Sequence, residues 1–144
     1  RKRSRMYQRI AHIALVVEDY DEAIKFYTQK LDFEVLEDTK LNDDKRWVMV
    51  APKGAKECCL VLAKAANESQ KHSIGNQTGG RVGFFLFTDD FWRDYNKIKD
   101  KQVNFVSNPT TFEYGTVAVF EDLYGNKWDL IEPNEKNKGL IKDK

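Results

Sequence analysis

The sequence has only two cysteines, three prolines and eight glycines among 144 residues. So little proline and glycine excludes collagen-like and low-complexity chains. Adjacent Cys58 and Cys59 supply no disulfide framework, and no signal-peptide pattern is visible, so we expect a cytoplasmic protein. The longest apolar runs, such as Ile13 to Val17, fall far short of the ~20 residues that cross a bilayer, so no membrane partner is expected.

An excess of charge of one sign is also lacking. The 24 basic residues nearly balance the 23 acidic ones, and four of the basic residues precede Met6. We interpret residues 1–5 as a tag ahead of a natural start at Met6, the alternative being a basic arm for nucleic acid or membrane. The remaining 20 basic residues form no patch, so no nucleic-acid partner is expected. Residues 134–144 are predicted to be a polar tail.

Hydrophobic periodicity predicts one domain over residues 6–133, built from two β-α-β-β-β units. Unit one covers 7–63, a polar linker covers 64–80, and unit two covers 81–133. A shift of 70 residues lays the start of one unit on the start of the other, which indicates a duplication. We therefore expect an α+β fold, with two paired units forming a curled mixed sheet around a cavity. The expected strands are 8–17, 33–39, 46–51, 58–63, 81–87, 103–106, 116–120 and 127–132, with helices over 20–31 and from Phe91 to Ile98.

Two stretches carry a resemblance to a known family. The stretch from His12 to Val35, HIALVVEDYDEAIKFYTQKLDFEV, resembles the opening unit of the glyoxalase/bleomycin-resistance/dioxygenase superfamily, also called vicinal oxygen chelate proteins. The stretch from Phe120 to Pro133, FEDLYGNKWDLIEP, resembles that family's last two strands. The chain is most similar to the lactoylglutathione-lyase-like branch. The resemblance implies a homodimer, and a small organic molecule as substrate or ligand.

The resemblance also implies a metal site. Metal-using members hold a divalent ion with His and Glu at four positions, on the first and last strand of each unit. These positions fall here on His12, Cys58 (or Cys59 if the alignment slips by one), Val82 and Asp129, and Val82 has no donor atom. His12, Asp129 and Cys58 are therefore the candidate ligands of Zn, Ni, Fe or Mn, and His12 and Asp129 the candidate catalytic residues. The alternatives are an acid–base pair without metal, or no cofactor at all.

Strand alternation assigns further side chains to the predicted cavity. His12 lies on the less apolar face of its strand, so it is expected to point away from the helix. Phe84 and Leu86 share the face of Val82, and they either make that part of the cavity apolar or belong to the core. The predicted pocket is completed by Arg81, Trp47 and Tyr114.

Two functions from different classes fit these residues. The first is a lyase, isomerase or dioxygenase that acts on a small oxygenated substrate at a modified metal site. The second is a metal-free protein that sequesters a small organic molecule, as the bleomycin-resistance members do. A purely structural module is the third alternative.

Overall fold

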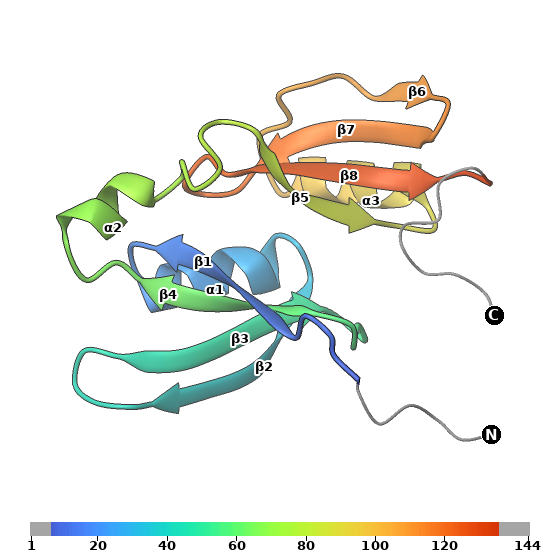
Figure 1. Ribbon diagram of the computed structural model, residues 1–144. Helices are drawn as coiled ribbons and strands as arrows, with labels where there is room; N and C mark the ends of the chain where they lie inside the picture. The colour runs from blue at the N-terminus through green and yellow to red at the C-terminus, as the bar shows by residue number, and fades with distance from the viewer. Residues whose placement is uncertain (1–6, 136–144) are drawn as a thin grey trace, which may run out of the picture. The chain divides into compact units, whose positions relative to one another are not determined.

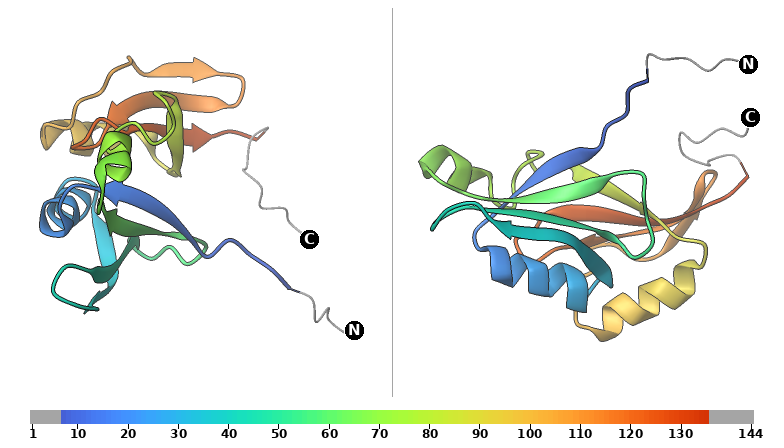
Figure 2. Two further views of the ribbon diagram at one scale, coloured as in Figure 1. Left: turned by 60° about the vertical axis from the view of Figure 1, so that its left-hand side comes forward. Right: turned by 90° about the horizontal axis from the view of Figure 1, so that it is seen from below.

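The computed structural model describes residues 7–135. The predicted tag at residues 1–5, and the part of the predicted tail that follows residue 135, lie outside the described residues. The chain forms two compact units, here called unit 1 and unit 2, with the boundary between Ala65 and Ala66. Each unit contains a four-stranded mixed sheet that carries a helix on one face (Figures 1 and 2), so the α+β prediction is confirmed.

The two units share one sheet topology. Unit 1 has the strand order β1-β4-β3-β2 and unit 2 has the order β5-β8-β7-β6, in which the first pair is parallel and the others antiparallel. The predicted duplication is therefore present in the backbone. Unit 1 consists of β1 (His12–Val17), α1 (Tyr20–Gln29), β2 (Phe33–Lys40), β3 (Arg46–Pro52) and β4 (Cys59–Lys64). Unit 2 consists of α2 (Glu68–Ser73), β5 (Val82–Phe87), α3 (Phe91–Asp100), β6 (Thr110–Phe112), β7 (Gly115–Glu121) and β8 (Lys127–Pro133).

The core of unit 1 lies between its sheet and α1. Leu15 and Val17 of β1 are fully buried, as are Ala23 and Tyr27 of the helix. The helix begins where the sequence predicted, because the carboxylate of Asp19 accepts a hydrogen bond from the Glu22 backbone N–H at 2.8 Å. This packing leaves the opposite face of the sheet without a helix.

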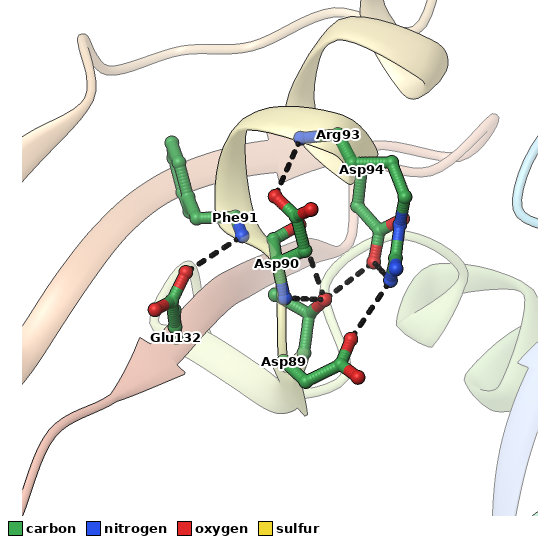
Figure 3. Close-up of polar contacts among 7 residues, drawn as sticks. Asp89, Asp90, Phe91, Arg93, Asp94 and Glu132 are labelled. Carbon is green, nitrogen blue, oxygen red and sulfur yellow. Dashed lines mark hydrogen bonds and ion pairs between the residues drawn. The ribbon is translucent and has the colours of Figure 1, made fainter.

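Helix α3 is fastened to the sheet of unit 2 at its first turn (Figure 3). The Asp90 carboxylate accepts a hydrogen bond from the Arg93 backbone N–H at 3.1 Å, and Glu132 of β8 accepts one from the Phe91 backbone N–H at 2.8 Å. Phe91, Tyr95 and Ile98 then point into the core, as their spacing predicted. The first turn of α3 is thus fixed at the carboxyl end of β8.

The strand predicted at 103–106 is wrong. Residues 104–106 do bond to β7, since Val106 N–H donates to Val119 O and Glu121 N–H donates to Asn104 O. The ladder ends there because the Ser107 hydroxyl, not a backbone carbonyl, accepts from Val119 N–H at 2.9 Å. Pairing resumes only after Pro109, which has no N–H to donate, and the edge strand is β6 instead.

The polar stretch 64–80 is more ordered than a linker. It contains helix α2, whose first turn is capped by the Asn67 side chain accepting from the Gln70 backbone N–H at 2.9 Å. Gly75 follows with a φ of 73° and lies directly against the backbone carbonyl of Tyr124. The segment therefore packs on the turn between β7 and β8. Within residues 7–135, no helix is long and apolar enough to span a membrane.

Candidate functional site

The helix-free face of the unit 1 sheet gathers the chemically active side chains of that unit. Because Val48 and Val50 of β3 point into the core, Trp47 and Met49 point to the other face. The parallel register of β1 and β4 sets His12 directly beside Cys59. His12 therefore points away from α1, as the alternation predicted.

His12 and Cys59 are in contact. The imidazole Nδ1 lies 3.0 Å from the Cys59 Sγ, and the two groups share a hydrogen bond. The Met49 Sδ lies 3.7 Å from the same sulfur, and the Trp47 ring meets the imidazole edge-on with centroids 6.0 Å apart. Burial, helped by the neighbouring Cys58, raises the pKa of the Cys59 thiol, while the positive charge of Arg9 partly offsets the rise. The thiol is therefore protonated at neutral pH.

The register distinguishes between the two adjacent cysteines. Cys59, and not Cys58, occupies the position next to His12. The physical reason is that neighbouring residues on an extended backbone point to opposite sides, so only one of the two thiols can share the face of His12. The Cys58 sulfur instead approaches the Cys59 backbone carbonyl at 3.8 Å.

A small cavity of about 180 Å³ adjoins this cluster. Its walls include His12, Met49 and Cys59, and its charged residues are Arg9, Lys56 and Glu57. Those charges sum to one positive charge at neutral pH. The predicted ligand Cys58 also lines the cavity.

The helix-free face of the unit 2 sheet carries exposed aromatic side chains. The register places Phe85 beside Asp129 and Phe87 beside Ile131, and these two phenyl rings are 61% and 41% exposed. On the edge strand, Phe112 is 47% exposed and stacks on Tyr114, with ring centroids 5.3 Å apart. Phe85 therefore lies directly beside the Asp129 carboxylate, whereas Phe112 lies on the far edge strand, level with Pro133.

The prediction that Phe84 and Leu86 share the face of Val82 is wrong, and the alternative that they belong to the core agrees with the register. The register of β5 slips between Val82 and Phe84, so the alternation inverts at Gly83, and Phe84 and Leu86 pair with the core residues Trp128 and Leu130. Phe84 accordingly stacks on Trp128 with centroids 4.6 Å apart. A glycine inside a predicted strand is the signal that could have indicated this bulge.

The other predicted pocket residues have separate positions. Trp47 lies on the helix-free face of unit 1, and Tyr114 extends that of unit 2 through its stack on Phe112. Arg81 is exposed just before β5, where its backbone carbonyl accepts a hydrogen bond from the Thr78 hydroxyl. The sequence reasoning missed Met49, Phe85 and Phe87.

Asp129 is a partly buried carboxylate without a polar partner. Within residues 7–135 it makes no hydrogen bond and no ion pair, and burial raises its pKa above the ordinary value. Between the ordinary and the raised pKa, the folded protein binds more protons than the unfolded chain. The free energy of unfolding therefore falls as the pH rises through that interval.

We expect Asp129→Asn to be more stable than the parent protein at pH 7, because asparagine carries no charge to desolvate. Near pH 3.5, where the parent carboxyl is mostly protonated in both states, the advantage should be small. Urea unfolding of both proteins at the two pH values measures the difference. If the stability gained by Asp129→Asn over the parent were smaller at pH 7 than at pH 3.5, burial would not be what raises the pKa of Asp129.

The donor atoms of neither unit fit a hard divalent ion. Within residues 7–135, no three His, Cys, Asp or Glu side chains gather closely enough to hold a metal. His12 has one thiol and one thioether beside it, and Asp129 has apolar neighbours, whereas such an ion needs three or more nitrogen, thiolate or oxygen ligands. We therefore derive no chemical step through a divalent metal.

Comparison with known proteins adds to this geometry. The model of a family described as the Glyoxalase/Bleomycin resistance protein/Dioxygenase superfamily matches residues 9–130. An uncharacterized protein of Shewanella frigidimarina is 58% identical over 132 residues, which cover 91% of this chain and 98% of that protein. The crystal structure of UcmS2 is 33% identical, with a TM-score of 0.78 over 88% of this chain and 99% of the other. TnmS3, an antibiotic binding protein from Streptomyces sp. CB03234, is 28% identical, with a TM-score of 0.71 over 89% of this chain and 98% of the other.

Proposed function

We propose that this chain, which belongs to the Glyoxalase/Bleomycin resistance protein/Dioxygenase superfamily, binds a small, largely apolar organic molecule without needing a metal ion. The superfamily often binds divalent metals, so this proposal concerns the present chain. The single observation that carries it is the helix-free face of unit 2, where the exposed Phe85 ring lies beside Asp129 and the exposed Phe87 ring follows on the same strand.

Exposed aromatic rings on one sheet face are unfavourable in water, and a ligand that covers them gains binding free energy. Phe85, Phe87 and Phe112 lie on that one face, and each is more than 40% exposed. A flat organic molecule would bury this surface and stack on the rings, at an offset or edge-on. Exposed apolar side chains that gather on one face favour a binding site there.

The carboxyl group of Asp129, on the same face, supplies the polar contact. Asp129 has no polar partner within residues 7–135, so a ligand hydroxyl, amide or amine can hydrogen-bond to it without displacing a protein group. The likeness to TnmS3, described as an antibiotic binding protein, supports this class of ligand. The expected ligand is thus a small aromatic molecule with one hydrogen-bonding group.

Equilibrium dialysis of chelator-treated protein tests the proposal. We expect saturable binding of 8-anilinonaphthalene-1-sulfonate, and no binding of glucose, which offers no ring face of comparable hydrophobicity. Absence of saturable binding of the aromatic compound up to about 1 mM, where the binding free energy is only about −4 kcal/mol, would refute it.

The lyase reaction, the homodimer and the cytoplasmic location remain predictions. For the first, we expect methylglyoxal hemithioacetal to turn over no faster than background when nickel, cobalt or zinc is added. Light scattering measures the molar mass of the protein in solution and so tests the predicted homodimer directly. A metal-dependent rate would restore the first hypothesis of the sequence analysis.

A further inference from the structure

We propose that unit 1 carries a binding site for a soft monovalent metal ion, Cu(I), formed by His12, Met49 and Cys59. This site shares His12 and Cys59 with the positions that the family resemblance implied, but it has Met49 in place of Asp129 as the third donor. It needs no residue of unit 2, and it uses a thioether that no family position predicted.

The three donors come from three consecutive strands of one sheet. Cys59 lies on β4, which has β1 with His12 on one side and β3 with Met49 on the other. All three side chains lie on the helix-free face and line the same small cavity of about 180 Å³. Cys59 is the central donor, since both other donor atoms approach its sulfur.

The distances suit one ion shared by three donors. Metal bonds of about 2.0–2.3 Å place the donor atoms around a common ion about 3.6–4.0 Å apart. The Cys59 and Met49 sulfurs already lie 3.7 Å apart. The His12 Nδ1 lies 3.0 Å from the Cys59 sulfur, so the ion needs a widening of less than about 1 Å, which a χ rotation of the exposed imidazole can supply.

Donor chemistry selects the ion. A thiolate and a thioether are soft ligands, and this combination favours Cu(I) over Mg²⁺, Ca²⁺ or Mn²⁺, which prefer oxygen. Thioether sulfur is a weak ligand for Zn²⁺, whose protein sites use thiolate, imidazole and carboxylate.

Charge selects a monovalent ion. Cys59 is the single anionic donor of the three, so its thiolate neutralises Cu(I) completely but leaves one positive charge with any divalent ion. That residual charge would lie in a partly buried cavity beside Arg9 and Lys56, against Glu57 alone. Such an arrangement is unfavourable because the uncompensated charge is poorly solvated.

Anaerobic titration of the reduced protein with Cu(I), held by the coloured chelator bicinchoninate, tests the site. The protein is prepared without an affinity tag. We expect each chain to withdraw one Cu(I) from the chelator. Cys59→Ser should abolish this transfer, and Met49→Leu, which conserves volume, should weaken it by at least ~10-fold.

Matched variants keep the test specific. His72→Gln and Met6→Leu remove residues of the same donor types elsewhere in the sequence and should leave the affinity unchanged. Cys58 lines the same cavity, but its sulfur approaches the Cys59 backbone carbonyl, so Cys58→Ser should weaken binding far less than Cys59→Ser. Far-UV circular dichroism checks that Met49→Leu and Cys59→Ser remain folded. Three results would each overturn the proposal: no transfer to the parent protein, an unchanged affinity in Met49→Leu, or a loss in Cys58→Ser as large as in Cys59→Ser.

Discussion

Replacing Gly75 with alanine is expected to lower the free energy of unfolding by about 2–4 kcal/mol. Two costs add at this position. The backbone φ of 73° disfavours any residue with a Cβ, and the new methyl group would overlap the Tyr124 backbone carbonyl, which cannot rotate away. Either the segment 74–80 lifts off the turn or the turn itself distorts. Chemical denaturation with urea measures the loss.

Gly79 offers a matched control in the same segment. Its φ of 70° is nearly the same, but a Cβ there would meet nothing within 4 Å. Gly79→Ala should therefore cost only the conformational part, about 1 kcal/mol. Equal losses of stability in the two variants would contradict the expected overlap between a methyl group at position 75 and the Tyr124 carbonyl.

The contact matters because the turn it supports leads into β8. The buried carboxylate of Asp122 accepts hydrogen bonds from the backbone N–H groups of Tyr124 and Asn126, both at 2.9 Å, and from the Asn126 side chain. This network fixes the turn one residue before the strand that carries Asp129. The packing of the segment 64–80 thus helps to position the proposed binding face of unit 2.

Phe85→Ala is expected to weaken the binding of an aromatic ligand by about ten- to a hundred-fold. The estimate follows from the roughly 1.5–3 kcal/mol gained when a phenylalanine side chain leaves water, and from 1.4 kcal/mol for each tenfold change in affinity. Because Phe85 is 61% exposed, its removal should change the free energy of unfolding little. Calorimetric titration of the parent and the variant with 8-anilinonaphthalene-1-sulfonate gives the ratio.

Trp92→Ala is the matched control for this prediction. Trp92 is 54% exposed and lies on α3, the helix that covers the other face of the sheet. Its removal deletes an even larger aromatic surface without touching the proposed site, so the affinity should stay within about twofold of the parent. If Trp92→Ala weakened binding as much as Phe85→Ala, the ligand would not lie on the helix-free face.

Much of the fold could be predicted because local signals agreed with the tertiary structure. The period-2 pattern of β1 predicted the first strand, and the cap at Asp19 predicted the start of the first helix. The strand at 103–106 could not be predicted, since the Ser107 side chain and Pro109 end the pairing, and neither effect depends on hydrophobic period. The short helix α2 has no buried side chain, so the apolar pattern gave no signal for it.

The site was predictable only in part, because strand faces depend on register. His12 needed only unbroken alternation, and its direction away from α1 was correct. Phe84 and Leu86 were assigned to the wrong face, since one bulge at Gly83 exchanges every side chain that follows it in β5. The approach of Met49 to Cys59 depends on the pairing of β3 with β4, which no short motif encodes.

The central claim, that this chain binds a small organic molecule without a metal, is tested most directly by one comparison. The compound that dialysis identifies as bound is titrated into the protein by calorimetry, first with EDTA and then with added zinc or nickel. The account predicts the same affinity and a stoichiometry of one or less per chain under both conditions. Binding that appears only with the added metal would contradict it.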